Sequence, residues 1–225
     1  MGEHWPIILG SRSPRRLELL EKLVDPSRIE VLPPSNSDEQ GFDDLATRAE
    51  FLDRIGEIVC AKVRNVRGQI ASRPSLSNCF LLTCDTTVVA NREDGSLIAL
   101  GQPPDDNWQR VVRDWFLSYY AGKTHSVLSC VSVCSLSEKK TEIFTSVCET
   151  RVTMTADVES KLDWYLASQE SPGKAGGYAI QGLASIFITQ VHGSFSNVVG
   201  LPLENTMQLL ADARAQPLPK GGTKP

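Results

Sequence analysis

The segment from Gly10 to Arg16 reads Gly-Ser-Arg-Ser-Pro-Arg-Arg and brings hydroxyl and guanidinium groups close together in the chain. It follows the apolar run Ile7-Ile8-Leu9 and precedes leucines at helical spacing, a pattern that predicts a strand, a loop and a helix. Ser13 is a favourable N-cap, and Pro14 is a favourable first helical residue. Hydroxyls, arginines and the free N–H groups of a helix start suit a multiply charged anion. A capped helix with two solvated arginines explains the segment equally well, so both interpretations stay open. The candidate anion ligands are Ser11, Ser13, Arg15 and Arg16.

Acidic side chains follow two predicted strands and offer carboxylates for metal binding or proton transfer. Asp85 comes directly after Phe80–Cys84, an apolar run that predicts a strand buried on both faces and ending at Asp85. Ligands of open α/β sheets bind at such strand ends, which favours a functional Asp85 over a carboxylate that caps a turn. Glu39 lies in a polar loop after a strand predicted over residues 28–32. A functional role and simple solvation are equally compatible with Glu39.

A lysine and a glutamine of a Gly-rich segment are further candidates for binding a charged ligand, and a second lysine lies in a predicted helix. Lys62 lies near the end of an amphipathic helix predicted from Asp43 to about Arg67. Lys174 lies in the Gly-rich segment 171–182, where glycines permit close approach of the backbone to a ligand. The side-chain amide of Gln181 in that segment is suited either to hydrogen-bonding the edge of a nucleobase or to hydrogen-bonding nearby backbone groups. Taken by itself, the Gly-rich segment favours an ordinary surface loop over a ligand-binding loop.

Composition narrows the function classes. The chain has 225 residues, 41% of them hydrophobic and 22% charged, which is typical of a globular protein. The net charge of −4 disfavours a nucleic-acid-binding protein, and no apolar run suits a membrane anchor. Six cysteines without metal-ligand spacing indicate reduced thiols and a cytoplasmic location.

The remaining periodicities predict a mixture of strands and helices around a long antiparallel hairpin of residues 124–136 and 141–154. This mixture predicts an α/β (mixed α+β) fold, and the length of the chain allows one large domain or two small ones. Residues 65–78 are interpreted as an exposed surface loop, and the Pro/Gly/Lys-rich tail 216–225 as disordered. Further strands are expected at 88–90, 97–100 and 184–191, and helices at 105–120, 157–168 and 201–213.

Four blocks together closely resemble the Maf family of nucleoside triphosphate pyrophosphatases, in matching order from Ile7 to about Leu210. They are Ser11-Arg-Ser-Pro-Arg-Arg16, Asp85-Thr-Thr-Val-Val89, Gly173-Lys-Ala-Gly-Gly-Tyr-Ala-Ile-Gln-Gly182 and Asn197-Val-Val-Gly-Leu-Pro202. The resemblance implies an elongated, twisted mixed β-sheet flanked by helices, similar to inosine triphosphate pyrophosphatases. It also implies a single domain over residues 1–215, a cleft between two lobes and, commonly, a homodimer.

The implied reaction cleaves a nucleoside triphosphate between its α and β phosphates, gives a monophosphate and pyrophosphate, and uses a divalent metal, Mg²⁺ or Mn²⁺. Such enzymes remove unwanted or modified nucleotides. The Asp85-Thr86 pair resembles family members that prefer dTTP and UTP. Carried over by position, the resemblance implies a phosphate loop formed by Ser11, Ser13, Arg15 and Arg16. It implies that Asp85 and Glu39 form an acidic pair that binds metal or activates water. It also implies further phosphate contacts from Lys62 and Lys174, and a place near the base or sugar for Gln181.

One departure from the family pattern affects the expected activity. The family carries Gly-Lys-Pro where this chain has Gly101-Gln102-Pro103, so one phosphate-facing cation is missing. Lys123 and Arg92 are the neighbouring candidates to replace it. An alternative function is therefore a nucleotide-binding regulatory protein with weak catalysis.

Overall fold

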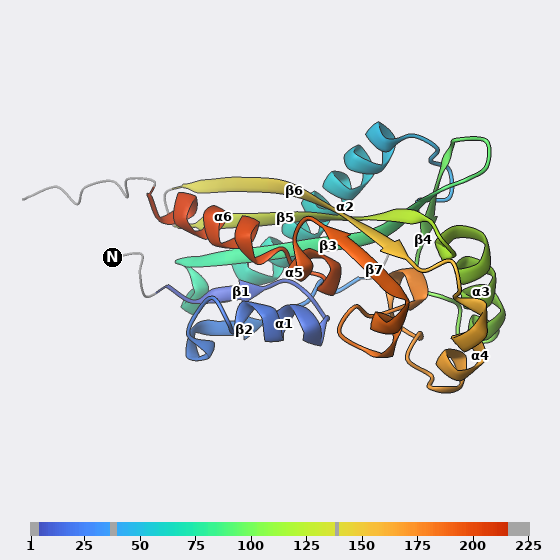
Figure 1. Cartoon of the computed structure of the whole chain (residues 1–225). Coiled ribbons are helices and arrows are strands. Elements are labelled where there is room, and N and C mark those ends of the chain that lie inside the picture. The colour runs from blue at the N-terminus through green and yellow to red at the C-terminus, as the bar shows by residue number, and fades with distance from the viewer. Residues whose placement is uncertain (1–4, 37–39, 138–139, 216–225) are drawn as a thin grey trace, which may run out of the picture.

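A mixed β-sheet runs along the length of the molecule (Figure 1). The structure, a computed structural model, describes residues 5–36, 40–137 and 140–215. Seven strands of the described residues form this sheet: six lie in the order β2-β1-β3-β5-β6-β7, and the seventh, β4, pairs with β3. β1 is parallel to β2 and β3, and the other pairs are antiparallel. The predicted mixed α/β fold is confirmed. The strands are β1 (Ile7–Leu9), β2 (Ile29–Val31), β3 (Cys79–Asn91), β4 (Leu97–Leu100), β5 (Thr124–Leu136), β6 (Thr141–Met154) and β7 (Ile188–His192).

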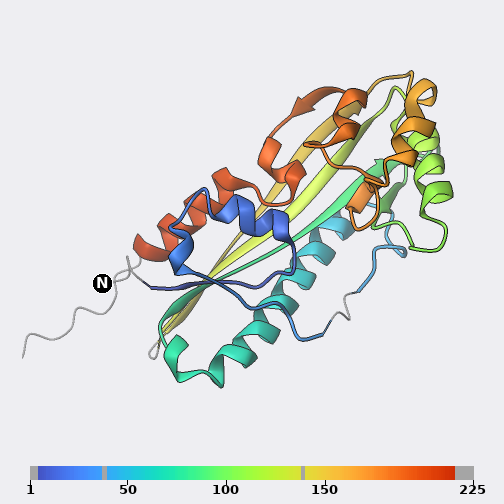
Figure 2. The same cartoon turned by 90° about the horizontal axis from the view of Figure 1, so that it is seen from below.

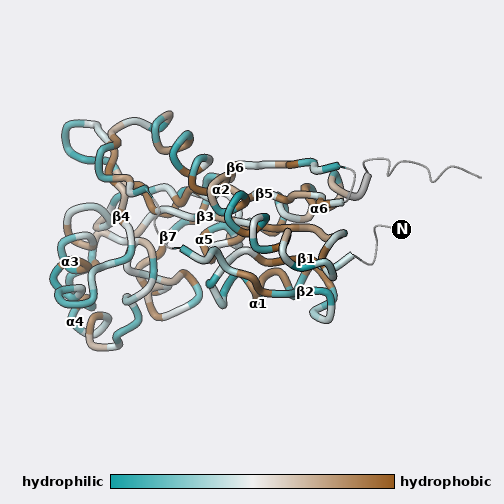
Figure 3. Tube along the Cα trace, turned by 180° about the vertical axis from the view of Figure 1, so that it is seen from behind, coloured by the Kyte–Doolittle hydropathy of each residue, from teal (hydrophilic) through white to brown (hydrophobic). Residues whose placement is uncertain are grey.

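Helices cover both faces of this sheet (Figure 2). Side chains alternate along a strand, so Leu81 of β3 faces one helix layer while Phe80 and Leu82 face the other. α2 packs on the first face, α1 and α6 pack on the second, and α3 and α4 close one end of the sheet. Figure 3 shows hydrophobic stretches along the strands and hydrophilic stretches in the outer turns of the helices. The helices are α1 (Pro14–Leu20), α2 (Arg48–Ala71), α3 (Trp108–Trp115) with a π-helical continuation (Phe116–Tyr120), α4 (Glu159–Ala167), α5 (Phe195–Val199) and α6 (Leu203–Ala215).

One edge of β3 carries two short partners with a gap between them. β1 pairs with Phe80–Leu82, and β4 pairs with Val88–Asn91. The opposite edge of β3 is paired with β5 from Cys79 to Val89. Residues 83–87 therefore face an opening between β1 and β4. The elements β1, β2 and α1 lie on one side of it, and α3 and α4 lie on the other (Figure 1).

The structure corrects the prediction that a strand ends at Asp85. β3 continues through Asp85 to Asn91, because β5 supplies a long antiparallel partner along the whole stretch. Asp85 nevertheless lies beyond the end of β1, so its position resembles that expected at a strand end of an open sheet.

Two predicted boundaries are also wrong. Residues 65–78 are not an exposed loop, since α2 continues to Ala71 and buries Val66 and Ile70 before a short 3₁₀ turn. The strand expected at 184–191 begins only at Ile188, because a 3₁₀ turn occupies Leu183–Phe187.

The hairpin prediction is confirmed at its stated ends by β5 and β6. All six cysteines are free thiols, as expected. A search of the described residues finds no helix with both the length and the apolarity needed to cross a bilayer. Glu39 and the tail 216–225 lie outside the described residues.

Candidate functional site

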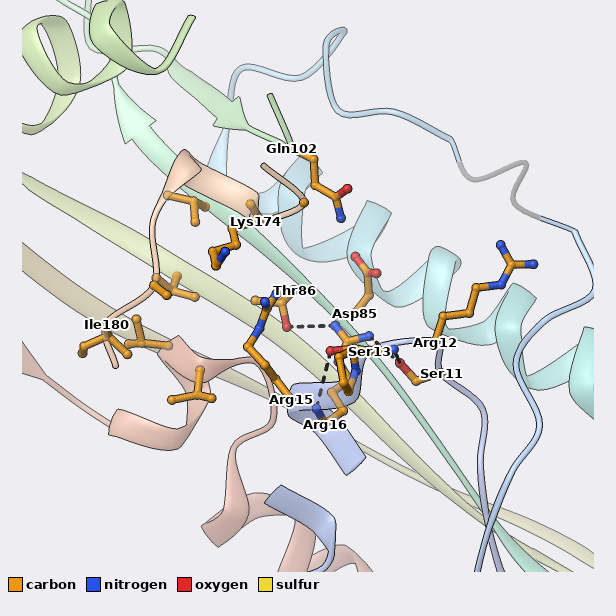
Figure 4. Close-up of a pocket in the computed structure, with 18 of the residues that line it drawn as sticks. Ser11, Arg12, Ser13, Arg15, Arg16, Asp85, Thr86, Gln102, Lys174 and Ile180 are labelled. Carbon is orange, nitrogen blue, oxygen red and sulfur yellow. Dashed lines mark hydrogen bonds between the residues drawn. The ribbon is translucent and has the colours of Figure 1, made fainter. Parts of the chain in front are cut away.

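A cavity of about 530 Å³ opens at the gap in the edge of β3 (Figure 4). Its floor is formed by Asp85 and Thr86, the central residues of the gap. Figure 4 shows the loop with Ser11 and Arg15 on one side of this floor and Lys174 with Gln102 on the other. Predicted site residues that line the cavity are Ser11, Ser13, Arg15, Arg16, Lys62, Asp85, Lys174 and Gln181. The structure thus gathers every described candidate around one cavity.

The loop before α1, residues 10–13, has features of both interpretations that the sequence left open, a capped helix and an anion site. Ser13 is the N-cap, and its Oγ accepts a hydrogen bond from the Arg16 amide at 3.4 Å. Ser11 Oγ accepts from the Ser13 amide at 3.2 Å and is buried. The helix is capped, and the capped loop also forms a wall of the cavity.

Arg16 holds this wall against two distant segments. Its Nε donates to the Gly200 carbonyl at 2.9 Å, and its terminal nitrogens donate to Ser11 Oγ at 3.1 Å and Thr86 Oγ1 at 3.2 Å. Thr86 Oγ1 lies 2.8 Å from Ser129 Oγ of β5, which extends the network into the sheet. The Arg16 guanidinium therefore fixes the loop, the floor and the end of α5 relative to one another.

Arg15 and Lys174 make one end of the cavity electropositive. Figure 4 shows Arg15 extending from the first turn of α1 toward Thr86 and Lys174. Burial, then the charge of Arg16, lowers the pKa of Arg15, and burial, then the charge of Arg15, lowers the pKa of Lys174. Lys174 Nζ donates to the backbone carbonyl of Glu170. Mutual repulsion of these cations would be relieved by a bound anion.

Asp85 and Lys62 form a buried ion pair beside this cluster. Lys62 Nζ lies 2.5 Å from Asp85 Oδ1, and each residue is only 9% exposed. The pair forms because Asp85 is on the face of β3 that packs against α2. A carboxylate held at a cavity floor by a lysine is suited to proton transfer or cation binding.

The fit of the cavity to a divalent cation rests on Asp85. Among residues 5–36, 40–137 and 140–215, no group of three or more histidine, cysteine or acidic side chains could hold a metal ion by itself. Asp85 is also the sole described carboxylate in the cavity lining. Mg²⁺ commonly binds through one or two carboxylates together with substrate phosphates and water, so this donor set fits a cation brought with a nucleotide.

Gln102 lies beside Lys174, at the position where the missing cation was expected. The two neighbouring candidates to replace that cation are directed elsewhere. Lys123 Nζ donates to the Ser118 carbonyl at 2.6 Å, and Arg92 donates to the Leu97 carbonyl at 3.2 Å. Neither residue lines the cavity.

Sequence reasoning missed the apolar wall and three polar residues of the cavity, Arg12, Asn36 and Thr86. Thr86 was part of a recognised block, but its contact with Arg16 was not predicted, and Arg12 lines the cavity while donating to the Pro34 carbonyl at 3.0 Å. The wall is assembled from four separate segments, so no local pattern marks it. Its members are Val88, Val127, Tyr178, Ala179, Ile180, Val198 and Val199.

His125 contacts the apolar wall through Tyr178. Its Nε2 lies 2.8 Å from the Tyr178 hydroxyl, and its ring is 1% exposed. Burial lowers the pKa of His125 to about 3. The imidazole is therefore neutral in the folded protein over the whole physiological range.

The pKa of His125 predicts a pH-dependent stability. Unfolding restores its ordinary pKa of 6.5, so between pH 6.5 and about 3 the unfolded state binds one more proton. The free energy of unfolding is unaffected by His125 above pH 6.5 and falls by about 1.4 kcal/mol per pH unit below it. In urea unfolding, wild type should lose about 1.4 kcal/mol more than His125→Gln between about pH 7.5 and about pH 5.5. Equal losses in the two proteins would contradict the prediction, and the exposed His192→Gln should behave as wild type.

Comparison with known proteins identifies the relatives of this chain. The family model described as Maf-like protein matches residues 6–213. A protein of Cereibacter sphaeroides named dTTP/UTP pyrophosphatase is 38% identical over 212 residues, covering 92% of this chain and 94% of its own length. Proteins of the same name from Brucella abortus and Pyrococcus abyssi are 34% and 33% identical, with coverage of 94% and 91% of this chain and 93% and 94% of their own lengths. The chain therefore belongs to the Maf-like protein family.

Proposed function

We propose that this protein is a nucleoside triphosphate pyrophosphatase that hydrolyses dTTP and UTP to the monophosphate and pyrophosphate. The observation that carries the proposal is the cavity in which buried Asp85 lies beside a cluster of cations on both walls. Relatives named dTTP/UTP pyrophosphatase align over most of their own lengths, which supports the same substrates here.

The charges of the cavity suit a triphosphate. Such a substrate carries about four negative charges, so its leaving pyrophosphate needs cations and hydrogen-bond donors. Arg15 and Lys174 supply charge from opposite sides of the floor, and Ser11 and Ser13 line the cavity on the side of Arg15. Arg16 is partly committed to Gly200, Ser11 and Thr86, so it contributes mainly by fixing that loop.

Asp85 is the proposed reactive carboxylate. Held by Lys62, it accepts a proton from the water that attacks the α phosphorus or orients that water. A divalent cation, Mg²⁺ or Mn²⁺, held by Asp85 and phosphate oxygens would supply charge neutralisation and lower the pKa of the attacking water. Glu39 is the second acidic residue proposed from the sequence.

The apolar wall is the proposed seat of the pyrimidine base. Val127, Ile180 and Val198 offer aliphatic surface to a flat ring, and Gln181, next to Ile180 in the chain, adds a hydrogen-bonding group to the cavity lining. Mixed apolar lining with a few polar groups is typical of small-molecule sites.

Incubating the purified protein with a nucleotide panel and Mg²⁺ tests the proposed function. Release of pyrophosphate and the monophosphate from dTTP and UTP, faster than from purine nucleotides, is expected. Binding of dTTP without any product would instead support the regulatory alternative. Phosphate release without pyrophosphate would place the cleaved bond elsewhere and contradict the proposal.

Gln102 favours the weak-catalysis alternative and provides a second test. Gln102→Lys would add a cation beside Lys174, where the family pattern has one. One added charge-assisted hydrogen bond to phosphate predicts a rise in kcat/KM for dTTP of about tenfold. Gln102→Met, which has similar length and no charge, should show no rise. Steady-state kinetics of both variants measure this, and an unchanged Gln102→Lys would indicate that the existing cations suffice.

The proposal includes two properties that the resemblance alone supports. They are a role in clearing unwanted nucleotides in the cytoplasm and assembly as a homodimer. Sedimentation equilibrium of the purified chain tests the homodimer directly.

A further inference from the structure

The Lys174 loop is bound to a buried aromatic cluster at two consecutive carbonyls. The Tyr120 hydroxyl donates to the Gly176 carbonyl at 2.9 Å, and the Tyr165 hydroxyl donates to the Gly177 carbonyl at 2.9 Å. Both tyrosines are fully buried, and their rings contact Phe116. Neither tyrosine lines the cavity.

The glycines permit this close approach. Gly176 and Gly177 have positive φ values of 73° and 68°. A Cβ on Gly176 would lie 2.7 Å from the Tyr120 hydroxyl, and one on Gly177 would lie 2.8 Å from Val112 Cγ2. The two carbonyls reach the tyrosines because no side chain separates the loop from the cluster.

The same loop also meets the segment that carries Gln102. The Gly176 amide donates to the Gly101 carbonyl at 3.0 Å, and the Gly177 amide donates to the Lys174 carbonyl at 2.9 Å. Gly176 is thus hydrogen-bonded through both its amide and its carbonyl. These bonds fix the backbone on which the Lys174 side chain stands relative to the cavity.

We propose that Tyr120 and Tyr165 are positioning residues, which hold Lys174 at the phosphate end of the cavity through the carbonyls of Gly176 and Gly177. The proposal rests on the proposed hydrolysis of nucleoside triphosphates. Loss of either hydroxyl leaves a buried carbonyl without its partner, so the loop shifts or samples other positions. Lys174 then meets the triphosphate less often in the productive geometry.

Tyr120→Phe and Tyr165→Phe test the proposal because they remove only the hydroxyl and retain the rings. We expect kcat/KM for dTTP to fall about fivefold in each variant, the effect of one net hydrogen bond. In a Lys174→Ala background, the added effect of Tyr120→Phe should be less than about twofold, because the lysine that it positions is gone. Tyr119→Phe is the matched control, since it removes a hydroxyl from a half-buried ring on the same cluster. It should leave kcat/KM for dTTP unchanged both in the wild-type protein and in the Lys174→Ala background.

Hydrogen exchange at the Gly176 and Gly177 amides gives a readout that does not depend on turnover. Exchange should accelerate about fivefold in both variants, and should equal wild type in Tyr119→Phe. Unchanged exchange would overturn the proposal even if activity fell. Accelerated exchange with wild-type kcat/KM, or with effects that add to Lys174→Ala, would also overturn it. A wild-type protein that hydrolyses no nucleotide would refute the proposed function, while the exchange result would still decide whether the hydroxyls hold the loop.

Discussion

Asp85→Asn should lower kcat for dTTP hydrolysis by about 10² to 10⁴ while leaving the fold intact. The amide has the shape of the carboxylate and can still accept a hydrogen bond from Lys62 through its oxygen. It carries no negative charge, however, so it neither accepts a proton from water nor binds a cation strongly. The effect should therefore appear mainly in kcat, with a smaller loss of affinity for the nucleotide because the bridging cation is held less strongly.

Steady-state kinetics and nucleotide binding measure the two quantities separately. Asp163→Asn is a matched control, because Asp163 pairs with Arg113 on the surface and is far more exposed than Asp85. Near-normal turnover in Asp85→Asn would remove Asp85 from the reaction. Complete loss of nucleotide binding in a folded Asp85→Asn protein would instead assign Asp85 to substrate binding.

Local patterns in the sequence were sufficient for the elements with regular periodicity. The Val/Thr-rich segments on either side of Ser137-Glu-Lys-Lys140 predict the β5–β6 hairpin at its observed ends. This prediction succeeds because the two strands are neighbours in the chain and pair with each other. The Ser13-Pro14 cap likewise depends on adjacent residues, and the structure contains it.

Patterns failed where a distant segment decides the conformation. Asp85 was expected at a strand end, but β5 extends β3 past it through pairings such as Asp85 with Cys130. The continuation of α2 was missed because polar residues interrupt the pattern, although Val66 and Ile70 preserve its buried face. Periodicity reports local burial, while strand length and helix ends depend on partners elsewhere in the chain.

The candidate site shows the same division. The residue types and the four motif blocks identify Arg15, Asp85 and Lys174 as charged groups for one ligand, and the structure brings all three to one cavity. The contact from Arg16 to Gly200 spans 184 positions, and its contact to Thr86 spans 70. No spacing rule along the chain encodes such contacts, so the supporting role of Arg16 emerges only from the folded structure.

The different contacts of the two neighbouring arginines lead to the second large effect. Arg15→Gln should raise KM for dTTP by about 10- to 100-fold with a smaller change in kcat, since one or two charge-assisted hydrogen bonds to phosphate are lost. Arg15 extends toward Lys174, and burial together with Arg16 already lowers its pKa. Its removal relieves repulsion in the empty cavity, so the free energy of unfolding should stay level or rise slightly.

Arg16→Gln should differ from Arg15→Gln in its effect on stability, because the Arg16 guanidinium joins the loop to Gly200, Ser11 and Thr86. We expect a lower free energy of unfolding, by about 1–3 kcal/mol, together with weaker nucleotide binding. Arg73→Gln, which breaks a surface pair with Glu30, is the charge-matched control and should alter neither KM nor binding. Urea unfolding and steady-state kinetics on the three variants separate the roles. If Arg15→Gln destabilised the protein and Arg16→Gln raised only KM, the assignments of phosphate contact and loop anchor would have to be exchanged.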